Sequence, residues 1–308
     1  MSNIAIIDLG TNTFNLLIAN TEGKILHNEK IAVRLGKKGI SRGLITEDAF
    51  DRALSTMQYY KTKATEWNTT KIVGIATSAV RNASNGTALA EAIKNKTGIE
   101  VRIISGKEEA DYIYKGVRKA MDLGSEMNLV IDIGGGSVEY IIGNNTDKVW
   151  SQSYEIGALR LFEQFHTNDP IPQENIKQLN DYLSIQLATL YNAVNQYKPQ
   201  TLIGSSGTFD TLAEINFCQK NQFKTYFEKP EYTLTLDEYH SISSILIKND
   251  RATRLAIPGM IEMRADLIVV ACLLINFTIE QFNIKNIRIS SYSLKEGILY
   301  SLLNPEHN

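Results

Sequence analysis

Acids, hydroxyls and glycines recur together at two places in this 308-residue chain. The denser group is Asp132-Ile-Gly-Gly-Gly-Ser-Val-Glu139, in which three consecutive glycines lie between two acids. Glycines let a backbone approach a ligand without a Cβ clash, so that several N–H groups can point at one anion. Asp132 can hold a hard cation such as Mg²⁺, which bridges to phosphate oxygens. The predicted phosphate-binding residues of this loop are Gly134, Gly135, Gly136 and Ser137.

The second loop, Asp8-Leu-Gly-Thr-Asn-Thr13, has hydroxyls and an amide where the first has glycines. These side chains can donate hydrogen bonds to phosphate while the turn presents backbone N–H groups. The position of Glu139 is taken here by Asn15. The two loops are therefore not interchangeable, and the carboxylate chemistry is expected at the Asp132–Glu139 loop. The predicted phosphate-binding residues of this loop are Gly10, Thr11, Asn12 and Thr13.

A third segment, Thr77–Gly86, follows an apolar strand and contains Ser78 and Arg81. Ligands of α/β sheets bind outside the carboxyl ends of the strands, where an arginine can hold a phosphate with two parallel hydrogen bonds. Both residues are therefore predicted to bind phosphate. The alternative is an arginine on an ordinary surface loop.

The segment Ser105-Gly-Lys-Glu-Glu-Ala110 offers a general base. Ser105 and Glu108 have the spacing of a capping box, which gives Glu108 a structural role. Glu109 then remains in the first helical turn, where a carboxylate can accept a proton from water attacking a phosphoryl group. The local sequence by itself favours the simpler alternative, an acid that complements the helix dipole.

Two weaker signals lie in the second half of the chain. Gly204-Ser-Ser-Gly-Thr208 follows an apolar strand and opens a helix, so its N–H groups can bind an anion, and Gly207 and Thr208 are candidates. Arg264 and Asp266 form either a pair that faces the ligand or a simple salt bridge at the start of a helix.

The elements that position these residues come from a duplication. Residues 4–26 overlay residues 128–150 without a gap, and Asp8 falls on Asp132. Each copy reads as strand, glycine turn, strand, turn and strand, and alternating helices and strands follow each. This order predicts α/β domains of related fold at residues 1–123 and 124–308, with the ligand in a central cleft between the two domains.

The expected helices and strands follow from periodicity, caps and breakers. After the first copy, helices are expected at 46–67, 86–98 and from 105, with strands at 71–77 and 99–104. After the second copy, helices are expected at 173–196, from 208, and at 236–247 and 262–278, with strands at 201–204 and 287–290. A final helix at about 293–304 is expected to pack back on the first domain.

Bulk composition excludes several classes of protein. The net charge of −2 argues against broad nucleic-acid binding, which needs a basic excess. No apolar run approaches the roughly 18 residues of a membrane span, and the first residues are too short an apolar run for a signal peptide. Cys218 and Cys272 lack paired spacing and are expected to be reduced. We therefore expect a cytoplasmic protein without nucleic-acid or membrane partners.

Taken together, the motifs resemble the exopolyphosphatase / guanosine pentaphosphate phosphohydrolase family of the actin, sugar-kinase and heat-shock-chaperone ATPase superfamily. The matching segments are IDLGTNTFNLLI, IATSAVRNASNG, ISGKEEADYIYKGV, VIDIGGGSVEYII, IGSSGTFDTLAE, PGMIEMRADLIVVA and SYSLKEGILY. The resemblance implies two ribonuclease-H-like domains of the actin-like ATPase kind and Mg²⁺- or Mn²⁺-dependent release of terminal phosphate. The implied substrates are inorganic polyphosphate and guanosine pentaphosphate, and the implied assembly is a homodimer.

The resemblance also implies roles for individual residues. Glu109 matches the family's catalytic glutamate, and Asp132 and Glu139 match its metal-associated carboxylates, with Asp8 as a further metal candidate. Arg81 matches its phosphate-clamping arginine. One departure is Val138, where the family has a hydroxyl. Basic residues that could follow a phosphate chain are scattered in the sequence: Arg34, Lys37, Lys38, Arg42, Lys107, Lys115 and Arg118.

Two alternatives to a phosphohydrolase stay open. A kinase-like phosphotransferase of the same superfamily needs an adenosine pocket, and no further glycine motif supplies one. A non-catalytic sensor of guanosine polyphosphates would have no need of Glu109, Asp132 and Glu139 together.

Overall fold

The chain forms an α/β structure with two mixed sheets, as expected from the sequence. The computed structural model describes residues 2–220 and 230–305. It divides into two compact units. Unit 1 contains Gly134–Gly136 with the described parts of Met1–Gly116 and Leu294–Asn308, and unit 2 contains the described parts of Val117–Ile133 and Ser137–Ser293.

The sheet of unit 1 has the strand order β3-β2-β1-β4-β5. Its first three strands form the predicted antiparallel meander, and β4 and β5 add parallel to β1 through helical crossovers. Asp8 lies near the carboxyl end of β1 and faces Asn15 of β2 in the register. The strand bounds are β1 Asn3–Leu9, β2 Phe14–Asn20, β3 Ile25–Ile31, β4 Thr69–Ala76 and β5 Val101–Ile103.

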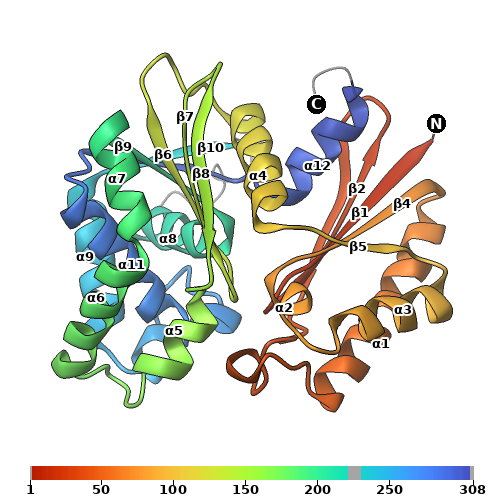
Figure 1. Ribbon diagram of the computed structural model, residues 1–308, viewed down its shortest axis with the longest axis horizontal. Helices are drawn as coiled ribbons and strands as arrows, with labels where there is room; N and C mark the ends of the chain where they lie inside the picture. Colours follow the sequence, from red (N-terminus) through yellow and green to blue (C-terminus); the bar gives the residue numbers. More distant parts are fainter. Residues whose placement is uncertain (1, 221–229, 306–308) are drawn as a thin grey trace. The chain divides into compact units, whose positions relative to one another are not determined.

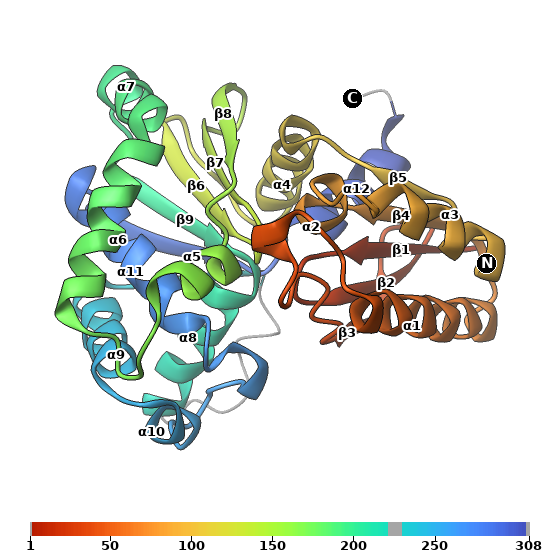
Figure 2. The same cartoon turned by 60° about the horizontal axis from the view of Figure 1, so that its bottom comes forward.

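The helices of unit 1 cover both faces of this sheet (Figure 1). Helices α1 and α3 lie side by side on one face, as Figure 2 also shows, and α12 contacts β1 on the other. Their bounds are α1 Glu47–Glu66, α2 Ser78–Arg81, α3 Gly86–Thr97, α4 Gly106–Ala120 and α12 Leu294–Leu303, with a short 3-10 helix η1 at Ile40–Arg42. Thr46 and Gly98 flank α1 and α3 as predicted, and Gly98 adopts the left-handed conformation that ends many helices.

The sheet of unit 2 repeats the order of the first and adds one strand, giving β10-β11-β9-β6-β7-β8. Strands β6, β7 and β8 form the second meander, and β9 and β11 continue it in parallel. The extra strand β10 pairs antiparallel with β11 at the edge. The strand bounds are β6 Asn128–Ile133, β7 Val138–Gly143, β8 Lys148–Tyr154, β9 Thr201–Ser205, β10 Glu231–Leu234 and β11 Asn286–Ser290.

The core of unit 2 is built on a nearly continuous apolar helix, α11. Its residues Ile268–Ile275 are buried, and Thr278 near its end exchanges a 2.7 Å hydrogen bond with Tyr140 of β7. The helices of unit 2 are α5 Ala158–Phe165, α6 Gln173–Gln186, α7 Ala188–Tyr197, α8 Ser206–Gln219, α9 Leu236–Lys248, α10 Arg251–Leu255, the 3-10 helix η3 Glu262–Arg264 and α11 Ile268–Gln281.

Several predicted bounds were wrong for identifiable reasons. The helix expected at 173–196 is interrupted at Leu187, where ψ is 16°, far from the helical value of about −42°. The helix expected at 262–278 begins instead at Ile268, after the 3-10 turn Glu262–Arg264. The helix expected from Thr208 begins two residues earlier, at Ser206, which has a φ of 71°.

The short elements α2, α5, α10, β10 and η1 were not predicted, because they carry too few residues for a periodic pattern. Among residues 2–220 and 230–305, no helix combines the length and the apolar character that crossing a membrane requires.

Candidate functional site

The two acids of the glycine motif are direct cross-strand partners in unit 2. Asp132 on β6 pairs with Glu139 on β7, and both side chains are buried. At the equivalent position in unit 1, Asp8 pairs with Asn15, whose Nδ2 donates to Asp8 Oδ2 at 2.9 Å. Directly opposite like charges destabilise a sheet, whereas a bound cation removes the repulsion. The second copy therefore presents a carboxylate pair where the first has an internally satisfied acid and amide.

Three serine hydroxyls surround the Asp132 carboxylate. Ser205, at the end of β9, donates to Oδ2 at 2.7 Å, and Ser206, at the start of α8, reaches Oδ1 and Oδ2 at 2.7 and 2.8 Å. Ser293, in the segment between β11 and α12, also donates to Oδ2. Glu139 in turn accepts a 2.6 Å hydrogen bond from Ser153 of β8. The carboxylates are therefore held in fixed orientations by neighbouring elements of unit 2.

The sequence analysis did not assign a role to these serines. It treated the Gly204–Thr208 segment only as a source of backbone N–H groups. The signal that could have found Ser205 and Ser206 is their position at the carboxyl end of β9, which pairs with β6 so that Ser205 lies opposite Asp132.

Gly207 and Thr208 lie in the first turn of α8, and the Arg264 side chain lies against Gly207. A Cβ at Gly207 would meet the guanidinium nitrogen Nη2 at 2.0 Å, so the Arg264 side chain would have to move to admit a larger residue. Burial lowers the pKa of Arg264, and the charges of Asp210 and Asp132 raise it part of the way back. Arg264 therefore lies in the field of Asp132, whereas Asp266 instead pairs with Arg251 at 2.8 Å.

In unit 1, two glycines of the Asp132–Glu139 motif lie against the side chains of Thr11 and Ser78. A Cβ at Gly136 would come within 2.5 Å of Ser78 Oγ and 2.7 Å of Thr11 Oγ1, and a Cβ at Gly135 within 3.0 Å of Thr11 Cβ. Thr11, Thr13 and Ser78 are buried. Close packing thus accounts for two of the three glycines, in addition to any approach to a ligand. The structure brings these predicted phosphate-binding residues together.

Arg81 and Glu109 form an ion pair in unit 1. The Nη1 atom of Arg81 donates to Glu109 Oε2 at 2.8 Å and to the carbonyl oxygen of Ile104 at 3.1 Å. Glu109 is buried, and Arg81 is largely so. The sequence analysis assigned these residues separately, to a phosphate and to a water, and the contact between them was not foreseen. It fixes the position of the Glu109 carboxylate.

Glu108, the neighbour of Glu109, makes the capping box that its spacing predicts. Its Oε2 accepts from the backbone N–H and the hydroxyl of Ser105, both at 2.9 Å, and the Glu108 N–H donates to Ser105 Oγ at 3.2 Å. The bond from the Ser105 backbone is the main reason that the pKa of Glu108 lies below its usual value. The two adjacent glutamates therefore have different surroundings: Glu108 is half-buried at a helix cap, and Glu109 is buried beside a guanidinium.

The donor set of Asp132 and Glu139 suits Mg²⁺. This ion keeps several waters and is usually held by one or two carboxylates together with substrate phosphates. Within the described residues, no cluster of three or more His, Cys, Asp or Glu side chains could form a complete protein cage. A site with two carboxylates fits magnesium better than zinc, which takes nitrogen and sulfur ligands.

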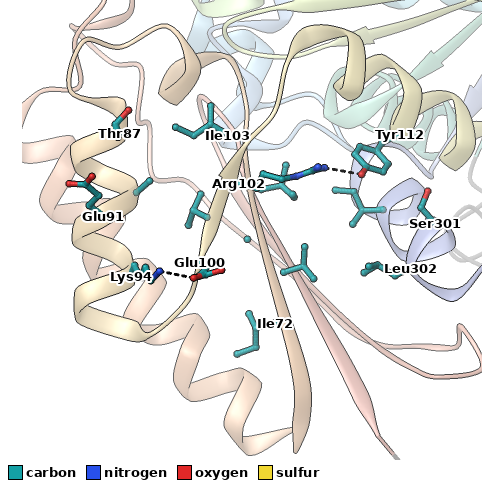
Figure 3. Close-up of a pocket in the computed structure, with 16 residues that line it drawn as sticks. Ile72, Thr87, Glu91, Lys94, Glu100, Arg102, Ile103, Tyr112, Ser301 and Leu302 are labelled. Atoms are coloured by element: carbon teal, nitrogen blue, oxygen red, sulfur yellow. Dashed lines mark hydrogen bonds and ion pairs between the residues drawn. The ribbon is translucent and has the colours of Figure 1, made fainter. Parts of the chain in front are cut away.

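A separate cavity of about 700 Å³ lies at the β5 edge of unit 1 (Figure 3). It is lined by residues of β4, β5, α3, α4 and α12 and contains none of the predicted site residues. Three of its charged side chains bond to neighbours: Lys94 pairs with Glu100 at 2.6 Å, and Arg102 donates to the Tyr112 hydroxyl at 2.8 Å. We therefore do not assign the phosphate chemistry to this cavity.

Comparison with known proteins places these features in a family. The profile of the Ppx/GppA phosphatase family matches residues 17–306. A putative exopolyphosphatase from Haemophilus influenzae is 27% identical over 97% of this chain and 91% of its own length. A guanosine-5'-triphosphate,3'-diphosphate pyrophosphatase from Pseudoalteromonas translucida is 28% identical over 99% of this chain, which spans 60% of that relative. The crystal structure of an exopolyphosphatase from Cytophaga hutchinsonii matches with a TM-score of 0.96 and 42% identity, covering 99% of this chain and 98% of that one.

Proposed function

The chain belongs to the Ppx/GppA phosphatase family, and from that premise we propose that it hydrolyses the terminal phosphoanhydride of inorganic polyphosphate or guanosine pentaphosphate with Mg²⁺. One observation carries the proposal: the duplicated sheets differ where Asp132 faces Glu139 and Asp8 faces Asn15. A protein that only cradled phosphate could keep the neutral pair in both copies. Two adjacent buried carboxylates instead suit a cation that neutralises phosphate oxygens.

In the proposed reaction, Glu109 accepts a proton from water as the water oxygen attacks the terminal phosphorus. The new P–O bond forms, the bridging P–O bond breaks, and the shortened chain leaves as a phosphate anion. Mg²⁺ held by Asp132 and Glu139, with Asp8 as a further candidate, would supply charge neutralisation on the phosphate oxygens. Arg81 orients the Glu109 carboxylate through their 2.8 Å ion pair.

The phosphates are proposed to bind to hydroxyls and N–H groups of the loops. Backbone N–H groups aimed at developing negative charge are the usual means of stabilising such a transition state. The residues proposed for this role are Gly10, Thr11, Asn12, Thr13, Ser78, Arg81, Gly134, Gly135, Gly136, Ser137, Gly207 and Thr208.

The test compares two neighbouring glutamates. Glu109→Gln should reduce phosphate release from polyphosphate by at least about 100-fold, because removal of a general base typically costs 10²–10⁴ in rate. Glu108→Gln is the matched control: it loses part of a helix cap, about 1 kcal/mol of stability, and should keep its turnover. Orthophosphate release with and without Mg²⁺ measures both. Near-normal release by Glu109→Gln, or release that survives chelation of Mg²⁺, would refute the proposal.

A further inference from the structure

The segment between β3 and α1 carries a run of positive charge. Four exposed cations occur there, and no acid occurs from residue 32 to residue 46. The whole chain has a net charge of −2, so this basic loop, residues 33–45, is a local departure from the average. Its cations are Arg34, Lys37, Lys38 and Arg42.

Most charged surface loops are mobile, but the basic loop is anchored at several points. Its side chains Val33, Leu35, Ile40 and Ile45 are buried in unit 1. At its end, Asn85 bonds twice to Ile45, donating to the carbonyl oxygen at 2.8 Å and accepting from the N–H at 2.9 Å. The four apolar anchors hold the backbone that carries the charges in one conformation.

Contacts within the loop hold its middle as well. Arg42 Nε donates to the carbonyl oxygen of Lys38 at 3.0 Å, and the Leu44 N–H donates to Gly39 O at 3.1 Å. Arg34 and Lys38 have φ angles of 52° and 60°, in the left-handed region that such residues rarely adopt. Conformations of this kind persist only where the surroundings impose them, and they gather at binding sites.

The basic loop is bonded directly to the phosphate-binding turn of the first meander. The Arg34 N–H donates to Asn12 O at 2.8 Å, and the Gly36 N–H donates to Thr11 O at 2.9 Å. Arg34, the first cation of the loop, is therefore bonded through its backbone to the turn that we propose to bind the terminal phosphates. A substrate bound at Thr11 and Asn12 presents an unbroken row of negative charge to this loop only if its phosphate chain continues.

We infer that the basic loop binds the phosphates of an inorganic polyphosphate chain behind the terminal ones, so that the substrate is a phosphate polymer rather than a nucleotide. This inference rests on the proposed function. Lysines act as point charges on phosphates, which suits a polymer that presents the same charge at every unit. A guanosine 5′-triphosphate 3′-diphosphate has a short 5′ phosphate chain that ends at a ribose carrying the base and the 3′-diphosphate, so it offers a row of cations no continuous chain of charge.

The experiment reverses the two lysines at the tip of the loop, Lys37→Glu with Lys38→Glu. The matched control is Lys71→Glu with Lys96→Glu, which makes the same charge change at exposed positions of unit 1. Lys71 lies near the start of β4 and Lys96 in the last turn of α3, whereas Thr11 follows the carboxyl end of β1. Circular dichroism and thermal unfolding establish that both double variants fold.

For the loop variant, KM for polyphosphate of tens of units should rise on the order of tenfold, with a smaller change in kcat. KM for tripolyphosphate and for guanosine pentaphosphate should change by much less. The dependence of log KM on log salt with the long chain should also become shallower, because fewer cations take part in binding. The control double variant should match the wild type in all of these.

Three outcomes would overturn the inference: equal KM for the loop variant and the control, equal effects on long polyphosphate and guanosine pentaphosphate, or an unchanged salt dependence. If the wild type released no phosphate from any substrate, the proposed function would fail separately. In that case, calorimetric titration of long polyphosphate into wild type and loop variant still decides the inference, since equal affinities contradict it and a weaker loop variant supports it.

Discussion

The same position in the two sheets carries different chemistry. Asn15 donates to Asp8, and Glu139 lies opposite Asp132, although the surrounding strands share their order and their antiparallel pairing. The amide of Asn15 donates a hydrogen bond to the carboxylate beside it, whereas two facing carboxylates repel each other and need hydrogen-bond donors or a cation from elsewhere. At Asp132, the hydroxyls of Ser205, Ser206 and Ser293 supply such donors. Single side chains therefore account for the specialisation of one copy of a duplicated fold.

Ser206 combines this hydroxyl with a strained backbone, and the two effects can be separated. Its φ of 71° disfavours every residue with a Cβ by about 1–2 kcal/mol, but it does not disfavour glycine. Ser206→Ala and Ser206→Gly both lose the hydrogen bonds to Asp132. We expect Ser206→Gly to be more stable than Ser206→Ala by about 1 kcal/mol, measured by urea unfolding.

Both Ser206 variants should bind Mg²⁺ about 10- to 100-fold more weakly than the wild type, because they lose the same partner of a metal-holding carboxylate. Isothermal titration with Mg²⁺ measures this without relying on turnover. If both variants bound Mg²⁺ as tightly as the wild type, Asp132 would not be a ligand of the metal. If the two variants were equally stable, the φ of Ser206 would not strain the backbone.

Asp169, which is partly exposed, and Arg254 form an ion pair in unit 2 that should contribute to the response of this unit to acid. Two Arg254 nitrogens contact the two Asp169 oxygens at 2.8 and 3.0 Å, and Arg254 is fully buried. Burial raises the pKa of Asp169, but the Arg254 guanidinium and the Arg251 N–H outweigh it, so that the pKa lies below its ordinary value. Asp169→Asn should cost about 2 kcal/mol at pH 7, because the buried guanidinium of Arg254 loses its charged partner and keeps only neutral acceptors such as backbone carbonyl oxygens.

The pH dependence follows from the direction of that shift. A carboxylate with a lowered pKa in the folded state contributes stability above its unfolded pKa of about 3.9, and this contribution is lost as the pH falls further. The stability difference between wild type and Asp169→Asn should therefore be constant near neutrality and shrink below about pH 4. Urea unfolding from pH 3 to pH 7 measures it, with exposed Asp181→Asn as a control expected within about 0.5 kcal/mol. A difference that grew in acid would be inconsistent with the ion pair.

Among the elements, α12 depends on one close approach to α4 in unit 1. A Cβ on Gly297 would lie 1.8 Å from the carbonyl oxygen of Tyr112, which belongs to a helix backbone that cannot move alone. Gly297→Ala should therefore destabilise unit 1 by roughly 1–3 kcal/mol or more, the usual cost of overpacking. Gly98→Ala is a control in which the Cβ meets open space and only a φ of 72° opposes it, at about 1 kcal/mol. Thermal unfolding measures the stability of both variants. Equal losses of stability would mean that α12 can move away from α4 at little cost.

Some helices and strands of this fold could be predicted from the sequence, and others could not. Both meanders, the long helices and the repeat of strand order follow from periodicity and from the overlay of residues 4–26 on 128–150, because hydrophobic patterns and turn residues are local. The break at Leu187 and the early start of α8 at Ser206 were not predictable, since tertiary contacts determine them.

The same limit applies to the candidate site. The residue types of Arg81, Glu109 and Asp132 were recognisable from their motifs. The Arg81–Glu109 ion pair joins residues 28 positions apart, and the Ser293–Asp132 bond joins residues 161 positions apart. Such contacts depend on how strands and helices meet, which spacing along the chain does not encode. The basic loop likewise looks scattered in the sequence until its hydrogen bonds to Thr11 and Asn12 are known.

For the whole molecule, the proposed phosphate-binding residues occur in both units, and ligand binding should therefore stabilise both. A ligand that binds only the folded state adds RT ln(1 + [L]/Kd), or about 2.7 kcal/mol at 100 times Kd. Proteins with more than one domain often unfold in more than one step, so each unit can have its own transition in calorimetry. The variants Gly297→Ala and Asp169→Asn identify these transitions, because each should lower only that of its own unit.

With Glu109→Gln to prevent turnover, adding Mg²⁺ and polyphosphate should raise the unfolding temperature of both transitions. Mg²⁺ without polyphosphate should raise mainly that of unit 2, because Asp132 and Glu139 belong to it. Polyphosphate with a chelator should have a smaller effect on unit 2 than the two together, since the phosphates complete the coordination of the metal. A shift confined to one transition under all three conditions would mean that the residues of the other unit, whatever their resemblance to a phosphate motif, take no part in binding substrate.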